Sequence, residues 1–145
     1  MQTLEIQGRL WNDGTNTYNS AEIICDYSLP TEKVFYLPFN YGYENQFIHN
    51  SIELLVNAGE LPQGTISERQ VKELGIDVIT SFKYCKKREM IQVKKYKISF
   101  FGRLSSSIGK VYKIREIIEA VTPDEAVKKL YILNKYEHIS ELSFK

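Results

Sequence analysis

Asp13 and Gly14 limit the fold of this chain more than any other feature, because they stand between two runs of strand-like sequence. In the first run, Thr3–Trp11, apolar residues alternate with polar ones, which is typical of a strand with one buried face. The Asp-Gly pair that joins this run to Thr17–Tyr27 is the strongest short-range signal for a β-hairpin. The chain is therefore predicted to begin with two antiparallel strands.

Val34–Phe39 is predicted as a third strand, which completes an antiparallel meander. Pro38 has no backbone N–H to donate, so this strand is expected to end there or to lie at an edge of the sheet. A long helix is expected over Glu44–Ala58, where apolar residues recur with helical spacing. Gly59 directly after it supplies a typical helix stop.

A short helix and a further strand are expected next. Ser67 can cap the helix, since Gln70 follows three residues later, and Gly75 can end it. The run Ile76–Cys85 then has the alternation of a strand.

The last third of the chain predicts a β-β-α-β unit. Strands over Lys95–Leu104 and Lys110–Val121 precede a helix over Thr122–Tyr136, which begins with a threonine cap and a proline in the first turn. The run His138–Phe144 alternates again and is expected to be the closing strand.

The net charge of +1 conceals a strongly uneven distribution. Residues 1–82 hold four basic and eleven acidic side chains, whereas residues 83–97 hold seven basic side chains against one glutamate.

From the predicted strands and helices together with this charge distribution, we predict an α+β fold in two domains. The first, residues 1–95, is an acidic antiparallel meander with one long and one short helix that ends in a basic strand segment. The second, residues 96–145, is the small β-β-α-β unit.

Several kinds of chemistry are absent from the sequence. His49 and His138 are the only histidines, Cys25 and Cys85 are isolated, and no glycine-rich phosphate-binding loop occurs. We therefore expect no metal site, no cofactor and no enzymatic activity, and we expect both cysteines to be reduced. No secretory signal and no apolar run of membrane-spanning length is present, so a cytoplasmic protein without membrane contact is expected.

Three short segments, GRLW (8–11), NTYNS (16–20) and YGYENQF (41–47), resemble a family of small phage-encoded proteins. That family has a Gly-Arg-x-Trp strand, an Asn-Thr-Tyr-x-Ser segment and a Tyr-Gly-Tyr-x-x-Gln helix start in the same order. Asn19 departs from the pattern where a histidine is expected, and Glu44 departs where a second glycine is common.

A second resemblance concerns residues 96–145, which are similar to the β-β-α-β domain of an archaeal large-subunit ribosomal protein of the LX type. It rests on the order of the strands and on EAVTPDEAVKKLY (119–131). Together the two resemblances imply an accessory protein of a phage or a similar mobile element.

This context and the acidic front favour a non-catalytic inhibitor that binds a host nucleic-acid-directed defence protein or ribonucleoprotein complex, in the manner of an anti-CRISPR protein. Such a protein acts in the cytoplasm of the infected host cell, and complementary charge speeds its association. The candidate partner-binding residues are Trp11, Asn16, Tyr18, Tyr41, Tyr43, Glu44 and Gln46.

Two alternatives remain open. The segment Lys83–Lys97 interleaves cations with tyrosines, which favours nucleic-acid binding, and its excess of lysine over arginine indicates binding that tolerates any sequence. The candidate nucleic-acid-binding residues are Lys83, Lys86, Lys87, Arg88, Lys94, Lys95 and Lys97. In the third hypothesis the protein sequesters a small ligand such as a nucleotide, with the aromatic and amide side chains of residues 40–47 as the pocket wall.

Overall fold

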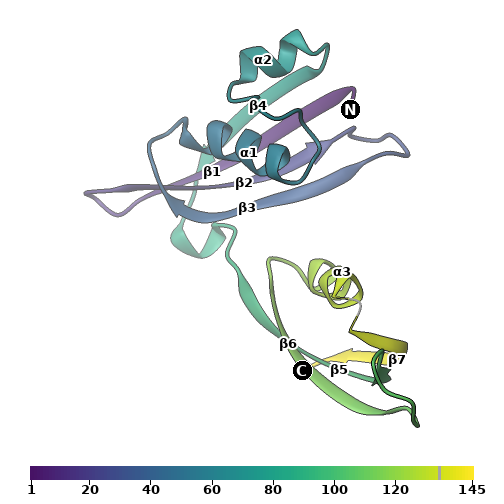
Figure 1. Ribbon diagram of the computed structural model, residues 1–145. Helices are drawn as coiled ribbons and strands as arrows, with labels where there is room; N and C mark the ends of the chain where they lie inside the picture. Colours follow the sequence, from purple (N-terminus) through teal and green to yellow (C-terminus); the bar gives the residue numbers. More distant parts are fainter. Residues whose placement is uncertain (134) are drawn as a thin grey trace. The chain divides into compact units, whose positions relative to one another are not determined.

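The computed structural model describes residues 1–133 and 135–145 of the chain. Over these residues the protein has seven β-strands in two sheets and three α-helices, so the α+β prediction is confirmed (Figure 1). The chain divides into two compact units, Met1–Gln92 and Val93–Lys145, and the predicted boundary after residue 95 lies three residues further along. No helix in this described part is long and apolar enough to cross a membrane.

The first unit contains a four-stranded sheet in the order β3-β2-β1-β4. Strands β1 (Thr3–Asn12), β2 (Thr17–Cys25) and β3 (Lys33–Tyr41) run antiparallel to one another in sequence. Strand β4 (Asp77–Tyr84) pairs with β1 in parallel, which local sequence patterns did not reveal. The sheet is therefore mixed rather than a pure meander.

The turn between β1 and β2 is the predicted hairpin. The Asp13 carboxylate accepts hydrogen bonds from the backbone N–H groups of Thr15 and Asn16, at 2.8 and 2.7 Å, and Gly14 adopts a φ of 98°. These N–H groups hold the pKa of Asp13 below its usual range, because they stabilise the charged carboxylate. Side-chain acceptance of this kind is why aspartate favours turns.

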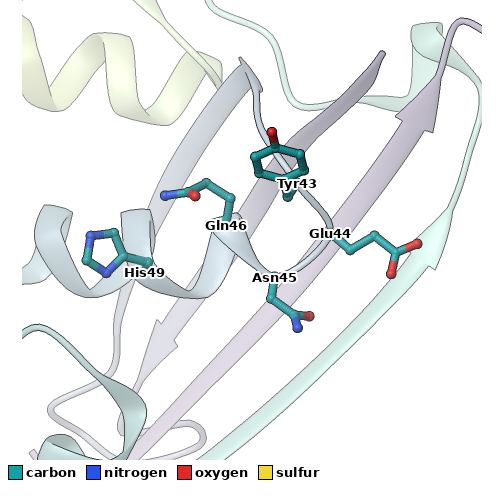
Figure 2. A pocket seen from close by; sticks show the side chains of 5 residues that line it. All are labelled: Tyr43, Glu44, Asn45, Gln46 and His49. Atoms are coloured by element: carbon teal, nitrogen blue, oxygen red, sulfur yellow. The ribbon is translucent and has the colours of Figure 1, made fainter. Parts of the chain in front are cut away.

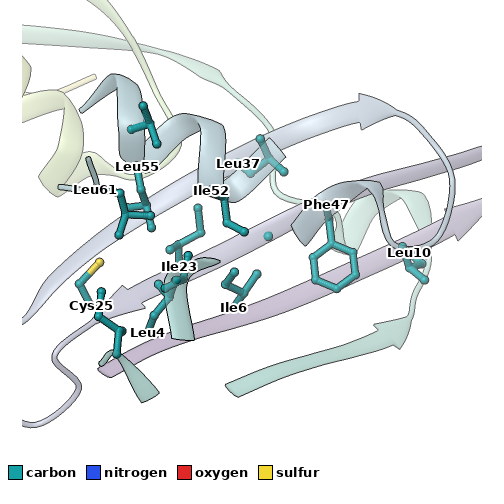
Figure 3. Packing of buried hydrophobic residues seen from close by; sticks show 14 residues of the cluster. Leu4, Ile6, Leu10, Ile23, Cys25, Leu37, Phe47, Ile52, Leu55 and Leu61 are labelled. Atoms are coloured by element: carbon teal, nitrogen blue, oxygen red, sulfur yellow. The ribbon is translucent and has the colours of Figure 1, made fainter. Parts of the chain in front are cut away.

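Helix α1 (Gln46–Asn57) lies across one face of the sheet, here called the inner face, and begins two residues later than predicted (Figure 1). Its Phe47 ring lies against Gly8 of β1, where an added Cβ would lie 2.7 Å from the ring, so the close approach requires glycine. Figure 3 shows Phe47, Ile52 and Leu55 directed towards the apolar side chains of β1 and β2. Short helix α2 (Glu68–Glu73) follows, with the predicted Ser67 cap accepting from the Gln70 backbone N–H.

The predicted basic strand segment up to residue 95 is wrong, because most of it is not a strand. Strand β4 ends at Tyr84, a 3₁₀ turn (η1, Lys87–Glu89) follows, and the next strand begins only at Lys94. The reason is that Met90 and Ile91 are apolar and become buried, with 4% and 6% of their surfaces exposed. We call Cys85–Gln92 the covering segment.

The covering segment contacts the outer face of the sheet, opposite α1. The Ile91 backbone N–H donates to the Ser20 hydroxyl at 3.2 Å, and the Arg9 guanidinium donates to the Glu89 carbonyl at 2.8 Å. The Ile91 carbonyl accepts from the Phe39 backbone N–H at 2.7 Å. Strand β3 continues past Pro38 to Tyr41 and lies at an edge of the sheet. An edge position was one of the two predictions for this strand; the other was that it ends at Pro38.

The second unit has a three-stranded antiparallel sheet in the order β6-β5-β7, with β5 (Lys94–Leu104) in the centre. Strands β6 (Tyr112–Ala120) and β7 (Tyr136–Phe144) flank it, and helix α3 (Pro123–Ile132) packs on one face.

The predicted helix over Thr122–Tyr136 begins correctly, since the Thr122 hydroxyl accepts from the Glu125 backbone N–H. The predicted end at Tyr136 is too late, because α3 ends at Ile132 and Tyr136 already belongs to β7. Residue 134 lies outside the described residues. The Tyr136 ring packs 5.1 Å from Phe100 in the core of the unit, a contact that strand geometry provides.

Candidate functional site

Four aromatic rings form one continuous surface on the outer face of the first sheet. Trp11 and Tyr18 are direct partners in the β1–β2 pair, with ring centroids 5.1 Å apart. The Tyr18 ring stacks on Phe39 at 5.0 Å with an interplanar angle of 12°, and Tyr41 meets Tyr18 edge-on at 5.8 Å. We call these four residues the aromatic platform. Tyr41 is its most exposed member, with 59% of its surface open to solvent.

A β-bulge brings the two rings from β3 onto this surface. Regular alternation would place Leu37, Phe39 and Tyr41 on one face of the strand. The register between β2 and β3 shifts between Asn19 and Ala21, so Leu37 is buried in the inner core while Phe39 and Tyr41 lie with Tyr18 on the outer face. Phe39 was missed by sequence reasoning for this reason.

Cations of the covering segment stand beside the aromatic platform. The Lys87 ammonium lies 5.2 Å from the centroid of the Trp11 ring, a distance at which a cation is attracted to the face of an indole. Lys86 and Arg88 flank it in sequence and are exposed. The structure thus joins members of two separately predicted sets, the partner-binding aromatics and the nucleic-acid-binding cations.

Asn16 is part of the turn at the end of the aromatic platform. Its backbone N–H binds the Asp13 carboxylate, which also accepts from the Tyr18 hydroxyl at 3.3 Å. The observed contacts of Asn16 therefore hold the turn and, through Asp13, the Tyr18 ring.

The other predicted partner-binding residues, Tyr43, Glu44 and Gln46, lie at the start of α1. With Asn45 and His49 they line a shallow hollow of about 470 Å³. Figure 2 shows their side chains pointing apart rather than towards a common centre.

The polar groups of this hollow bind other parts of the first unit. Glu44 accepts from the Tyr84 hydroxyl, which raises the pKa of that phenol, and Gln46 donates to Asn50 at 3.0 Å. The His49 ring nitrogen lies 3.1 Å from the Ile66 carbonyl. These engaged groups, together with the diverging side chains, give the small-ligand hypothesis no specific support.

Gly42, between Tyr41 and Tyr43, has an internal role. A Cβ at this position would lie 2.7 Å from the side-chain nitrogen of Asn19, which is fully buried. The Asn19 side chain therefore faces the interior of this protein rather than its surface.

The seven predicted nucleic-acid-binding cations are divided between the two units. Lys83 lies on the outer face of β4, next to its register partner Arg9, and Lys86, Lys87 and Arg88 belong to the covering segment. The remaining three, Lys94, Lys95 and Lys97, belong to β5 in the second unit.

Lys95 and Lys97 are part of a larger charged surface on the second sheet. Alternation along β5 and β6 gathers five cations on the face opposite α3, and we call this surface the basic face. Its members are Lys95, Lys97, Arg103, Lys113 and Arg115. The spacing of lysine and arginine around buried Ile114 was the signal that sequence reasoning overlooked.

Only part of the charge on the basic face is compensated. Lys95 lies 3.7 Å from Glu119, and Arg103 pairs with Glu137 at 3.1 Å. Lys97, Lys113 and Arg115 form no ion pair with any residue that the structure describes.

Both thiols are kept protonated by their surroundings. Burial raises the pKa of Cys25 to about 11, and burial followed by the charge of Glu89 raises the pKa of Cys85. The Cys85 sulfur lies 3.3 Å from the sulfur of Met90 in the covering segment. Within residues 1–133 and 135–145, no group of three histidine, cysteine or acidic side chains has an arrangement that could hold a metal ion.

No protein-family model matches the chain, and neither a curated protein nor a solved structure matches it. The aromatic platform and the basic face are therefore the features from which a function can be inferred.

Proposed function

We propose that this protein binds single-stranded nucleic acid, tolerating any sequence, on the aromatic platform of its first unit. The observation that carries the proposal is the Lys87 ammonium, 5.2 Å from the centre of the Trp11 ring, beside the stacked rings of Tyr18 and Phe39. Proteins that hold single strands combine such aromatic surfaces with cations that follow the backbone.

The chemistry of the aromatic platform favours a single strand over a duplex. Bases of a single strand can turn outward and stack on aromatic side chains, whereas duplex bases already stack on one another. The exposed ring of Tyr41 and the half-exposed indole of Trp11 are the surfaces that bases would meet. Tyr18 and Phe39 hold these rings in place through their mutual stacking.

The neighbouring cations favour binding that does not depend on sequence. Lysine ammonium groups neutralise phosphates as point charges, whereas reading a guanine edge needs the planar fork of arginine. Arg9 already donates to the Glu89 carbonyl, and Arg88 is the remaining arginine next to the platform in the covering segment. Lys86 and Lys87 would therefore bind phosphates without selecting bases.

The inhibitor hypothesis stays a prediction alongside this proposal. The first unit carries eight basic and twelve acidic side chains, so its net negative charge remains consistent with docking to a basic protein surface. No feature of the described residues indicates which host protein would be bound. Titration with oligonucleotides and an assay of nuclease inhibition together distinguish the two functions.

The test uses the fluorescence of Trp11, the only tryptophan of the chain. Titration with oligothymidine or oligoadenosine strands is expected to quench this fluorescence, with similar affinities for both strands and weaker binding to a duplex of equal length. Tyr41→Ala should weaken binding by about 5- to 150-fold, since one stacked base contributes about 1–3 kcal/mol. Tyr27→Ala, which removes an equally exposed tyrosine from the β2–β3 turn, is the control.

Two results would contradict the proposal. One is the absence of both quenching and anisotropy change with any oligonucleotide at low salt. The other is equal weakening by Tyr41→Ala and Tyr27→Ala. A protein that binds no oligonucleotide but blocks target cleavage by a host nucleic-acid-guided nuclease would establish the inhibitor function instead.

A further inference from the structure

The two edges of the first sheet are protected very differently. At the β3 edge, Pro38 removes one donor, a bulge distorts the strand, and the Ile91 carbonyl accepts from the Phe39 backbone N–H. Each of these devices discourages another strand from pairing there.

The opposite edge, β4, has none of these devices. Its register with β1 runs without a shift from Asp77 to Tyr84, and it contains neither proline nor glycine. No residue of β4 is buried, and Ile79, Phe82 and Tyr84 expose 60%, 52% and 60% of their surfaces. In the described part of the chain, β4 pairs with β1 alone. A regular, exposed and apolar edge strand is a template for strand addition.

We propose that β4 pairs antiparallel with β4 of a second copy of this chain, about a two-fold axis that passes midway between the Thr80 residues of the two copies. A two-fold axis perpendicular to the sheet keeps the inner faces of both copies on the same side, so opposed residues must come from the same face. The two four-stranded sheets then form one sheet of eight strands.

The side chains of β4 are complementary in this register. On the outer face, Asp77 lies opposite Lys83 of the second copy, and the symmetry repeats this pair at the other end. On the inner face, Val78 lies opposite Phe82 of the second copy, again twice. Opposite charges and apolar side chains at directly opposed positions stabilise a strand pair.

Neighbouring registers lose this match. A pairing centred on Ser81 would place Lys83 opposite Ile79, and one centred on Ile79 would place Asp77 opposite Ser81. Among registers that keep the faces aligned, the one centred on Thr80 alone joins the two charges of the strand.

The dimer would bring two aromatic platforms onto one face of a continuous sheet, because the platform and the side chains of Asp77 and Lys83 share the outer face. The inference itself rests on β4 and stands without nucleic-acid binding. Dimerisation through β4 and nucleic-acid binding can therefore each be disproved without affecting the other.

The first experiment measures mass against concentration for the full chain of 16.9 kDa by sedimentation equilibrium. Wild type is expected to approach twice this mass as concentration rises. Asp77→Lys and Lys83→Asp should each raise the dissociation constant by roughly tenfold, since two attractive pairs become two like-charge pairs. An equimolar mixture of both variants should recover the wild-type value, because opposite charges then meet at both ends.

Glu53→Lys on α1 changes an exposed side chain by the same charge as Asp77→Lys, so it is the control for that variant and should leave association unchanged. The circular dichroism of every variant is compared with wild type to confirm folding. A wild type that stays monomeric, or a mixture that associates no better than its components, would overturn the proposal.

A second experiment tests the register by disulfide formation in a Cys85→Ala background. Thr80→Cys should crosslink two copies on oxidation, because residues on the axis face each other at a distance that a disulfide can span. Ser81→Cys, which faces Ile79 of the second copy, should crosslink much less. Equal crosslinking of the two variants would exclude the register centred on Thr80.

Discussion

The two units of this protein share a plan, a sheet with helical cover on one face, but differ in what happens to the other face. The larger sheet carries the covering segment and the aromatic platform on its outer face, whereas the smaller sheet presents the basic face to solvent. Its unit holds eleven basic and six acidic side chains, the reverse of the acidic first unit. A sheet face covered by its own chain can remain apolar, and an uncovered face takes charged side chains.

The units also differ in the size of their cores. In the described part of the chain, the first core cluster contains fourteen buried residues and the second contains seven. Since stability grows with buried apolar area, the first unit is expected to be the more stable of the two.

The largest expected effect is that of Phe47→Ala, which would break this order of stability. Phe47 is 1% exposed and lies against Gly8, so its removal should lower the free energy of unfolding of the first unit by about 3–5 kcal/mol. Urea unfolding followed by Trp11 fluorescence reports on the first unit, and circular dichroism reports on both. Leu130→Ala in α3, equally buried in the second core, should leave the fluorescence transition in place. A shift of the fluorescence midpoint by Leu130→Ala would show that the units unfold together.

A smaller effect is expected from acid, through Asp26 of the first unit. The Asp26 carboxylate accepts from the backbone N–H of Gln2, the hydroxyl of Thr31 and the backbone N–H of Thr3, which lowers its pKa below the usual value. Its contribution to stability is therefore present above the unfolded pKa of about 3.9 and is lost as pH falls through the lower folded pKa.

Asp26→Asn should make the midpoint of the first unit less dependent on pH in this acidic range. Asparagine also tolerates the φ of 56° at this position. The measurement is the urea midpoint by Trp11 fluorescence from pH 2 to pH 7. An unchanged pH profile would show that Asp26 does not contribute.

The smallest expected effect concerns the basic face of the second unit. Lys97→Glu together with Arg115→Glu should reduce the dependence of log K on log salt by roughly 0.7 for each phosphate contact that is lost. The measurement is anisotropy of a long oligonucleotide at several salt concentrations. Lys110→Glu with Lys128→Glu, an equal charge change in the same unit, is the control. Identical slopes for the two double variants would mean that the basic face contributes only through net charge.

Local signals predicted those parts of the fold that depend on neighbouring residues. The Asp13 carboxylate and Gly14 form the hairpin turn within a few residues, and the Thr122 cap acts on its own helix. The helix end was misjudged because Tyr136 joins the core next to Phe100, which is distant in sequence. Propensity gives way to such tertiary contacts.

The candidate site was only partly predictable for the same reason. Trp11, Tyr18 and Tyr41 were chosen from their residue types, but Phe39 reaches them only through the bulge near Ala21. Parallel pairing of β4 with β1 joins strands more than seventy residues apart, and no local pattern records it. The run of cations likewise concealed the two apolar residues that fix the covering segment to the sheet.

Burial of Met90 has a consequence for the entropy of binding. Many basic segments are disordered tails, which lose conformational freedom when they meet an anionic partner. In this chain the cations at residues 86–88 lie just before Met90, which is 96% buried. The Glu89 carboxylate also accepts a hydrogen bond from the Lys86 backbone N–H at 2.7 Å. The backbone of these cations is thus already ordered by folding. An anionic strand would meet charges whose positions are set in advance, so less of the interaction energy is spent on immobilising them.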